Sequence, residues 1–211
     1  TLYGKEKRHE RPNCRNPDRR SHHGYRAIRN PESGDADKRI SKRATKVKIL
    51  DPCCGSRMMY FDKQDQRVLF GDIRQEEHYL KDRDSVRYLE VKPDIKLDFT
   101  NLPFDDESFR LVVFDPPHLM HAGKKSWLAK KYGKLGEDWR NDIKKGFSEC
   151  FRVLEEGGVL IFKWNENQIS TREILSLTDE KPIFGHVTRK HKTNQTATHW
   201  FTFIKGTANE N

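Results

Sequence analysis

The sequence has few cysteines and no long apolar run, and both absences narrow the class of protein. Its 211 residues include four cysteines, whose spacing does not fit the disulfide scaffold of a small secreted protein. No apolar stretch has the length of a signal peptide or a membrane span. We therefore expect a cytoplasmic protein that does not bind a membrane. The cysteines are Cys14, Cys53, Cys54 and Cys150.

Acidic and apolar residues are scarce in the amino-terminal segment. Residues 1–48 hold 15 Lys and Arg but 6 Asp and Glu, so this stretch alone accounts for the net charge of +9. Basic segments often contact nucleic acids, because Lys and Arg release counterions from phosphates. We predict that residues 1–46 form a nucleic-acid-contacting arm, and a solvated tail is the alternative that this composition also allows.

The same segment contains histidine and cysteine residues, which are the usual ligands of zinc sites. The spacing of these residues matches no standard zinc pattern, and histidines among arginines more often contact nucleic acid or solvent. We expect no metal site, and zinc binding by the segment stays open as a minor alternative. The residues concerned are His9, Cys14, His22 and His23.

From residue 47 onward the sequence alternates strand and helix patterns. Four apolar runs each end in an aspartate, and a fifth covers residues 159–164. Apolar residues at helical spacing between 138 and 156 predict an amphipathic helix that ends at Gly157-Gly158. Strands that alternate with helices indicate a mainly parallel sheet with helices on both faces. The four runs that end in aspartate are residues 47–51, 67–72, 95–98 and 111–115.

Two further strands at 184–189 and 199–204, joined by a polar turn, predict an antiparallel hairpin. The expected fold is thus a Rossmann-like α/β domain with a mainly parallel seven-stranded sheet and a carboxyl-terminal antiparallel hairpin. This domain covers residues 47–205, and residues 206–211 form a tail.

The turn after the first strand predicts a cofactor site, because ligands of such sheets bind beyond the carboxyl ends of the strands. In Asp51-Pro52-Cys53-Cys54-Gly55-Ser56, the glycine lets the backbone approach a ligand closely. Asp72 lies about twenty residues on, where a carboxylate can accept both hydroxyls of a ribose. The turn lacks Gly-x-Gly-x-x-Gly, which disfavours a dinucleotide and hence a nicotinamide-dependent dehydrogenase. As the alternative, Asp51 caps a helix and Asp72 faces solvent.

Two positions after the third strand extend this prediction. Asp98 and Phe99 place a carboxylate and an aromatic ring where an adenine could be held. A loop carboxylate and a core phenylalanine are the alternative roles. The predicted cofactor residues are Asp51, Pro52, Cys53, Cys54, Gly55, Asp72, Ile73, Asp98 and Phe99.

The strongest chemical signal follows the fourth and most apolar strand, at Asp115-Pro116-Pro117-His118. Two successive prolines fix the backbone and remove two N–H donors, which leaves carbonyl oxygens free to face a cavity. A carboxylate and rigid carbonyls can accept hydrogen bonds from an amino group and orient its nitrogen toward a methyl donor. We predict these four residues as the catalytic ones.

Taken together, these motifs resemble class I S-adenosylmethionine-dependent methyltransferases that modify exocyclic amino groups, above all the N6-adenine and N4-cytosine enzymes. The chain is particularly similar to small methyltransferases of phages and prophages, over residues 47–205. The resemblance implies that the first turn holds the methionine part of the cofactor, that Asp72 holds its ribose, and that the Asp115 turn holds the target amine.

Two residues depart from the family pattern. His118 stands where a Tyr, Phe or Trp usually stacks on the target base, and imidazole can both stack and form hydrogen bonds. Cys53-Cys54 stands where a phenylalanine is common; we expect these thiols to pack without acting as nucleophiles.

The segment after His118 predicts a contact surface for the target. Lysines and aromatic residues interleave there, which suits phosphates and bases. An amphipathic helix packed on the core, with solvated lysines, is the alternative, and Trp164 could likewise belong to the core. The predicted substrate-binding residues are His121, Lys124, Lys125, Trp127, Lys163 and Trp164.

The sequence therefore predicts an enzyme that transfers a methyl group from S-adenosylmethionine to an exocyclic amine of a nucleic-acid base, N6 of adenine in DNA or RNA. Methylation of a protein amide or a small amine is one alternative. A catalytically silent nucleic-acid-binding scaffold is another.

Overall fold

A computed structural model of the chain describes residues 47–82, 85–123, 126–188 and 197–206. The predicted arm at 1–46, the predicted zinc ligands within it, and Lys124 and Lys125 lie outside the described residues. No helix of the described ranges is long and apolar enough to cross a membrane.

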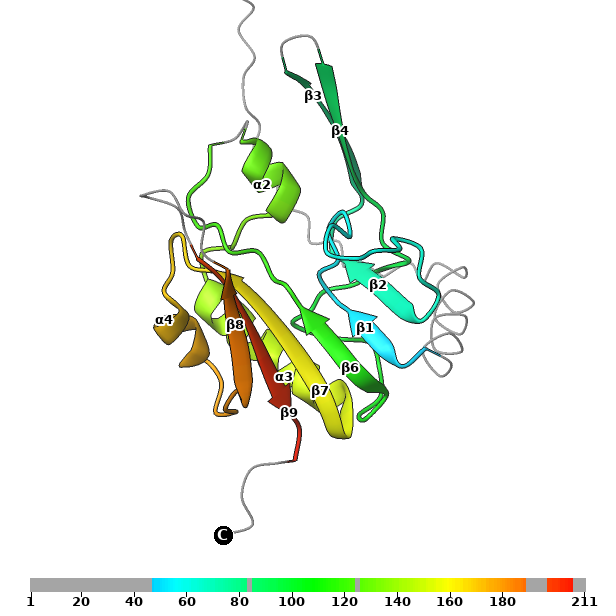
Figure 1. Cartoon of the computed structure of the whole chain (residues 1–211), viewed down its shortest axis with the longest axis vertical. Helices are drawn as coiled ribbons and strands as arrows, with labels where there is room; N and C mark the ends of the chain where they lie inside the picture. Colours follow the sequence, from blue (N-terminus) through cyan, green and yellow to red (C-terminus); the bar gives the residue numbers. More distant parts are fainter. Residues whose placement is uncertain (1–46, 83–84, 124–125, 189–196, 207–211) are drawn as a thin grey trace, which may run out of the picture.

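The core is a seven-stranded sheet with the order β5-β2-β1-β6-β7-β9-β8 (Figure 1). The five strands from β5 to β7 are parallel, whereas β9 runs antiparallel to both β7 and β8. This confirms the Rossmann-like sheet and the carboxyl-terminal antiparallel pair that the apolar runs predict. The strands are β1 (Ile49–Asp51), β2 (Val68–Asp72), β5 (Ile95–Lys96), β6 (Phe109–Phe114), β7 (Leu154–Asn165), β8 (Phe184–Thr188) and β9 (Thr198–Ile204).

The central strands have apolar sequences because they are buried on both faces. Every residue of β2 is buried, and Val112, Val113 and Phe114 of β6 are buried as well. The main core joins this sheet to helix α3 (Trp139–Val153) through aromatic pairs such as Phe114 and Phe147, whose ring centroids lie 5.5 Å apart. The buried residues of α3 that the helical spacing predicts are Trp139, Ile143, Phe147, Cys150 and Phe151.

The end of α3 differs from the sequence prediction. The helix ends at Val153, and Gly157-Gly158 lies inside β7, which already begins at Leu154. Leu154 pairs with Phe109 across the sheet, and the register then shifts before Leu111 pairs with Val159. Gly157 has a φ of +71°, a conformation that glycine adopts without strain, so the pair of glycines marks an irregularity in a strand rather than a helix end.

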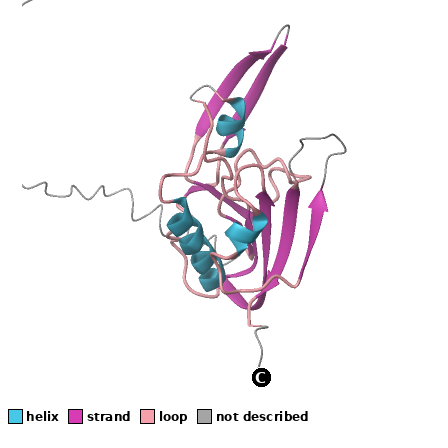
Figure 2. Cartoon of the chain, turned by 90° about the vertical axis from the view of Figure 1, so that its left-hand side faces the viewer, coloured by secondary structure: helices cyan, strands magenta, loops and turns pink. Residues whose placement is uncertain are grey.

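Two connections on the β2 side of the sheet contain no helix in their described residues. Residues 52–67 form turns and bends and contain no helix. Between β2 and β5 the chain instead forms a separate hairpin of β3 (Glu76–Asp82) and β4 (Ser85–Val91), which the sequence does not predict. This hairpin projects beyond the sheet in both views, with α2 (Trp127–Tyr132) beside its base and α4 (Thr171–Leu175) lower on the body (Figures 1 and 2).

Candidate active site at the carboxyl ends of the parallel strands

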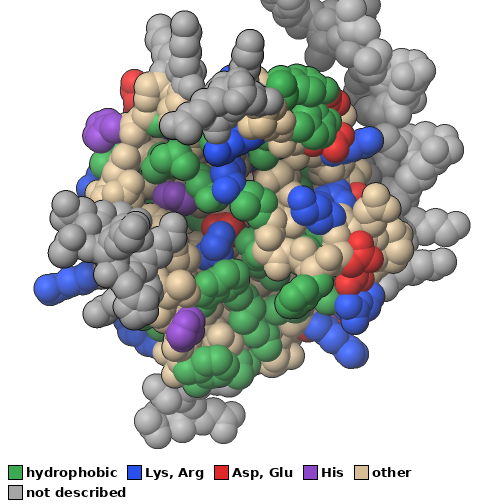
Figure 3. All heavy atoms as spheres, turned by 45° about the horizontal axis from the view of Figure 1, so that its top comes forward, with side chains coloured by type: hydrophobic (Ala, Val, Ile, Leu, Met, Phe, Trp, Pro, Cys, Tyr) green, Lys and Arg blue, Asp and Glu red, His purple; other side chains and the backbone are tan. Residues whose placement is uncertain are grey.

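The parallel strands bring their terminal charged residues to one edge of the sheet. Asp51 ends β1, Asp72 ends β2, Asp115 follows β6, and Lys163 lies near the end of β7. Asp51 and Asp72 are the buried charged residues of the described ranges. The space-filling view shows this edge as a hollowed face, with an acidic side chain recessed beside basic ones and hydrophobic side chains around them (Figure 3).

Asp51 is a fully buried carboxylate that organises the first turn. It accepts hydrogen bonds from the Cys53 backbone N–H at 3.0 Å and from the Tyr60 hydroxyl at 2.9 Å, so it does not cap a helix. Burial raises the pKa of Asp51 to about 7, and the two hydrogen bonds oppose that rise. Tyr60 is a functional neighbour that sequence reasoning missed, because no periodic pattern marks it.

Few atoms pack against the turn at Gly55. Its φ is +50°, and a β-carbon added there would meet little besides the Arg74 guanidinium, at 3.7 Å. The Cys54 N–H donates to the Gly71 carbonyl at 2.8 Å, which joins the turn to β2. Cys54 is buried and Cys53 half-buried, and burial raises the pKa of both thiols. These two cysteines therefore pack as neutral thiols beside the Gly55 backbone.

The Asp72 carboxylate already has protein partners. One oxygen accepts from the Gly55 N–H at 2.9 Å, and the other accepts from the Arg74 N–H at 2.9 Å and its Nε at 3.2 Å. Arg74 also donates through Nη1 to the Lys130 carbonyl of α2 at 2.9 Å and to Glu76 of β3 at 3.3 Å. Arg74 thus ties β2, the hairpin and α2 together at the predicted ribose position, and no sequence pattern marked it.

The remaining residues predicted to bind cofactor lie further along the edge. Ile73 is exposed, and Asp98 is an exposed carboxylate that accepts two hydrogen bonds of 2.8 Å from Thr100. Phe99 is half-buried and packs edge-on against Phe114 at 5.4 Å, beneath α3. The contacts of Asp98 and Phe99 are those of a loop carboxylate and a core ring.

Asp115 and Lys163 form an ion pair across the ends of β6 and β7. Burial raises the pKa of Asp115, while the neighbouring ammonium of Lys163 opposes the rise. Pro116 is buried and Pro117 half-buried beside this pair. Both charged side chains keep about a fifth of their surface exposed, so the pair can reach a ligand in the hollow.

His118 lies in an aromatic setting. Its ring centroid is 5.1 Å from that of Tyr132 in α2 and 6.3 Å from that of Trp164. Burial, assisted by Lys163, lowers the pKa of His118 to about 4, so the imidazole is neutral at physiological pH. Trp164 is fully buried and donates to the Ile169 carbonyl at 3.0 Å. The Trp164 indole therefore lies in the core, the alternative role that the sequence allows, and it packs edge-on against the His118 ring.

The loop after His118 is held by a single side chain. Gln168 accepts from the backbone N–H groups of Met120 at 2.7 Å and His121 at 2.8 Å, and it donates to the His121 carbonyl at 2.9 Å. His121 itself is exposed, and Trp127 begins α2, which Ser126 caps at its amino end. Sequence reasoning missed Gln168 because it lies 47 residues beyond the loop it holds.

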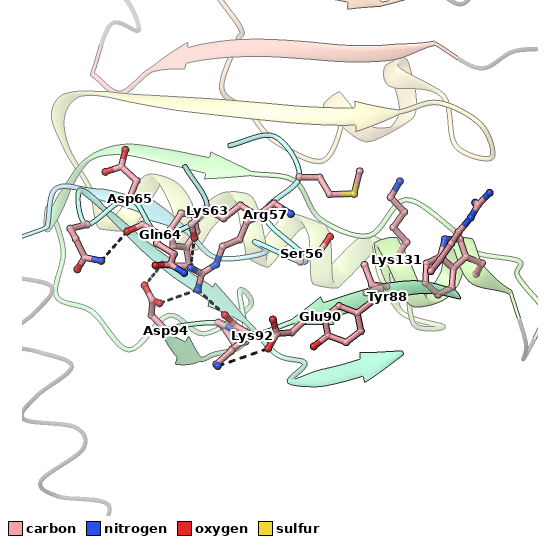
Figure 4. A pocket seen from close by; sticks show the side chains of 18 residues that line it. Ser56, Arg57, Lys63, Gln64, Asp65, Tyr88, Glu90, Lys92, Asp94 and Lys131 are labelled. Carbon is pink, nitrogen blue, oxygen red and sulfur yellow. Dashed lines mark hydrogen bonds and ion pairs between the residues drawn. The ribbon is translucent and has the colours of Figure 1, made fainter. Parts of the chain in front are cut away.

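Two hollows meet at this edge. The smaller one, of about 50 Å³, is lined by Cys53, Asp115, Pro116, His118 and Lys163, among others. The larger one, of about 1010 Å³, extends along the β1–β2 connection and β4 (Figure 4). They share lining residues, so they lie next to each other. The shared residues are Gly55, Ser56, Met58 and Lys131.

No protein-family model matches the chain, and no curated protein matches it. Solved structures share part of its architecture. The PH0226 protein from Pyrococcus horikoshii is 15% identical, with 86% of this chain and 94% of that chain covered at a TM-score of 0.47. TrmN from Thermus thermophilus is 14% identical over 85% of this chain and 51% of its own, at 0.48. An rRNA methylase from Streptococcus thermophilus is 12% identical over 85% and 99%, at 0.42.

Proposed function

We propose that the chain is an S-adenosylmethionine-dependent methyltransferase that modifies an exocyclic amine of a nucleic-acid base, N6 of adenine in DNA or RNA. The observation that carries the proposal is the ion-paired Asp115 beside Pro116 and His118, in a hollow that reaches the Gly55 turn. An amine acceptor and a methyl donor can meet only where such an acceptor site adjoins a cofactor site.

The donor set at the edge fits the methionine part of the cofactor. In the described part of the chain, a β-carbon added at Gly55 would meet only the Arg74 guanidinium at 3.7 Å and the Lys131 carbonyl at 3.9 Å, and Gly55 borders the same hollow as Asp115. Cys53 and Gly55 would hold this end of the cofactor. When bound, S-adenosylmethionine supplies an electrophilic methyl group on a sulfonium.

The ribose end fits after one rearrangement. Asp72 can accept ribose hydroxyls once the Arg74 side chain leaves its oxygens, while the bond from the Gly55 N–H can remain. Ile73 and Asp98 are exposed next to it and would border the adenine. The Arg74 side chain is about one-fifth exposed, which gives it room to move toward solvent.

On the acceptor side, residues of the chain orient the amine of the target base and leave its nitrogen lone pair free. The Asp115 carboxylate and the Pro116 carbonyl accept its two N–H hydrogens, which directs the nitrogen lone pair away from them and toward the methyl donor. Lys163 favours the ionised form of Asp115, the form that can accept. The neutral His118 ring offers a flat surface for the base and places no positive charge beside the sulfonium.

A nucleic-acid target is supported by the basic balance of the sequence, since residues 1–48 carry its net charge of +9. It is also supported by Lys131 and Trp127, which line the larger hollow next to the acceptor site. A base in a strand must leave its stack to reach a recessed carboxylate, and an aromatic wall such as His118 and Tyr132 suits an unstacked base.

The test is transfer of tritium from labelled S-adenosylmethionine to DNA, total RNA and protein, followed by nucleoside analysis. We expect label in N6-methyladenine, and an Asp115→Ala variant that loses turnover while it still binds the cofactor in calorimetry. Glu137→Ala, at an exposed position, serves as the matched control for removal of a carboxylate. Label confined to protein would show that the methyl acceptor is a protein amide and not a nucleic-acid base. Absence of cofactor binding at millimolar concentration would favour a silent scaffold.

A further inference from the structure

The larger hollow is a groove whose walls come from three parts of the chain. Residues 55–66 form one wall, β4 and the residues after it form the second, and α2 closes one end. It runs over the part of β2 where the described residues of the neighbouring connections form no helix, and Phe70 lies at its floor. Its volume of about 1010 Å³ is at the upper limit for small-molecule pockets, roughly 300–1,000 Å³.

Basic side chains dominate the groove. Five Lys and Arg line it against three Asp and Glu, and each of those acids lies near a base: Asp65 pairs with Arg67 at 2.6 Å, Asp94 with Arg57 at 2.9 Å, and Glu90 with Lys92 at 3.9 Å. Lys63 and Lys131 form no ion pair with any residue of the described ranges. Figure 4 shows them well apart along the groove. The basic residues are Arg57, Lys63, Arg87, Lys92 and Lys131.

Aromatic faces stand between these charges. Tyr88 of β4 is 50% exposed and Trp127 of α2 is half-buried, and both line the groove. Tyr88 packs against Tyr79 on the opposite strand, with ring centroids 5.0 Å apart, and Tyr79 is 66% exposed. A two-stranded hairpin has little stability of its own in water, so a ligand that covers the exposed face of Tyr88 would stabilise it.

From these contacts we infer that the groove binds a single-stranded stretch of nucleic acid next to the target base, an inference that rests on the proposed function. Unpaired lysines attract phosphates, and Tyr88 and Trp127 offer faces on which bases stack without regard to sequence. The shared lining at Gly55 and Lys131 lets one strand pass from the groove to the hollow of Asp115.

The cofactor is a poorer occupant of this groove. S-adenosylmethionine carries a net positive charge, which Lys63 of the groove repels, whereas a polyanion is attracted. The predicted cofactor residues Asp72, Asp98 and Phe99 do not line the groove either. The strand and the cofactor are therefore expected to bind together.

The test uses the full chain and a fluorescein-labelled single-stranded DNA of about 12 nucleotides, within the range of single-strand sites, with an RNA of the same sequence as a second probe. In fluorescence anisotropy, we expect Lys63→Glu to reduce the slope of log affinity against log salt by about 0.7 or more. We expect Tyr88→Ala to weaken binding about 5- to 150-fold with little change in that slope.

Two variants serve as matched controls. Lys144→Glu makes the same charge change at an exposed position of α3, and Tyr79→Ala removes the same cross-strand ring pair from the side that does not line the groove. Both should bind the oligonucleotide within about twofold of the unchanged protein, since surface changes away from a site have small effects. Equal losses in the test variants and their controls would overturn the groove assignment.

Four further outcomes decide the inference. Displacement of the oligonucleotide by saturating S-adenosylmethionine would assign the groove to the cofactor and overturn it, as would a duplex of the same sequence that binds equally well. Groove-dependent binding without any methyl transfer to nucleic acid would uphold the groove and refute the proposed function. Methyl transfer to nucleic acid by a protein whose oligonucleotide affinity does not change in Lys63→Glu and Tyr88→Ala would refute the groove assignment and uphold the proposed function.

Discussion

Lys163 of β7 forms an ion pair with Asp115, the residue that follows β6. The two strands are parallel neighbours, and Phe114 pairs directly with Phe162, so the ladder itself sets this pair. A lysine at this position gives the proposed acceptor carboxylate a fixed countercharge, which the Asp-Pro-Pro pattern alone does not reveal.

Replacing Lys163 should shift the pH dependence of turnover. Burial raises the pKa of Asp115, and Lys163 opposes this rise, so Lys163→Met should raise the pKa further. The ionised form then exists only at higher pH, and the acidic limb of the pH–rate profile should move upward, with a loss of about 10- to 100-fold near pH 7.

Lys163→Arg keeps the charge and should leave the acidic limb close to that of the unchanged protein. The profiles are measured by tritium transfer between about pH 5.5 and 9, a range that covers the expected shift. An acidic limb that does not move in Lys163→Met would show that Asp115 is not the group that titrates.

Two buried groups, His118 and Asp51, should make the free energy of unfolding depend on pH in opposite directions. The pKa of His118 falls from 6.5 to about 4 on folding, so its contribution to stability is lost as the pH drops below 6.5. The pKa of Asp51 rises from 3.8 to about 7, so its contribution is present at low pH and is lost as the pH climbs toward 7. Between about pH 4 and 6.5 the two dependences should largely cancel.

Single substitutions should separate the two groups. In His118→Phe, the free energy of unfolding should decrease as the pH rises from 4.5 to 6.5, by at most about 1.4 kcal/mol per pH unit. In Asp51→Asn, whose amide oxygen can accept from Cys53 while its NH2 can donate to the Tyr60 hydroxyl oxygen, it should increase over the same range. Urea unfolding at several pH values measures both, and parallel curves for the two variants would refute the assignment.

Removing the Arg74 side chain should strengthen cofactor binding. Arg74 occupies the Asp72 oxygens that a ribose would use, so Arg74→Ala removes a competitor, and calorimetry should show S-adenosylmethionine binding about tenfold more tightly. Asp72→Ala should weaken it by a similar or larger factor. Weaker binding in Arg74→Ala would instead show that the guanidinium contacts the cofactor directly.

Gln168 should affect turnover because it fixes the loop that follows His118. Gln168→Leu removes three hydrogen bonds to Met120 and His121, each worth about 1 kcal/mol, and frees the loop that follows His118. We expect kcat to fall about 10- to 100-fold with cofactor affinity unchanged. Gln168→Glu keeps the two acceptor bonds and should lose less. Equal kcat values in the two variants would contradict this role.

The parallel strands are predictable from the sequence because buried strands need uninterrupted apolar residues, as in the fully buried β2. The β3–β4 hairpin has no such signal, since most residues of β4 are exposed and its buried residues, Leu89 and Val91, lie at its end. Its charged sequence resembles a loop, and only the backbone ladder between Glu76 and Val91 defines it.

The motif aspartates are predictable for the same reason as the strands that carry them. Two of their partners are not, because Tyr60 and Arg74 lie in irregular segments that carry no periodic pattern. Lys163 is predicted at the end of its strand, but as a substrate contact and not as the ion-pair partner of Asp115. Trp164 shows the converse limit: its position at a strand end suggests a ligand contact, but packing around Phe162 and Ile169 buries it completely.

The pairing of strand β7 on both sides affects which parts of the molecule open transiently. Lys163 lies in a strand that is hydrogen-bonded on one side to β6 and on the other to β9, so its backbone opens only when the sheet itself comes apart. Arg74 and the hairpin, by contrast, are anchored by side-chain contacts and a two-stranded ladder. Amide exchange should thus be slowest at the acceptor half of the edge and fastest at the cofactor half. Warming should then weaken cofactor retention at temperatures where the acceptor geometry is still intact.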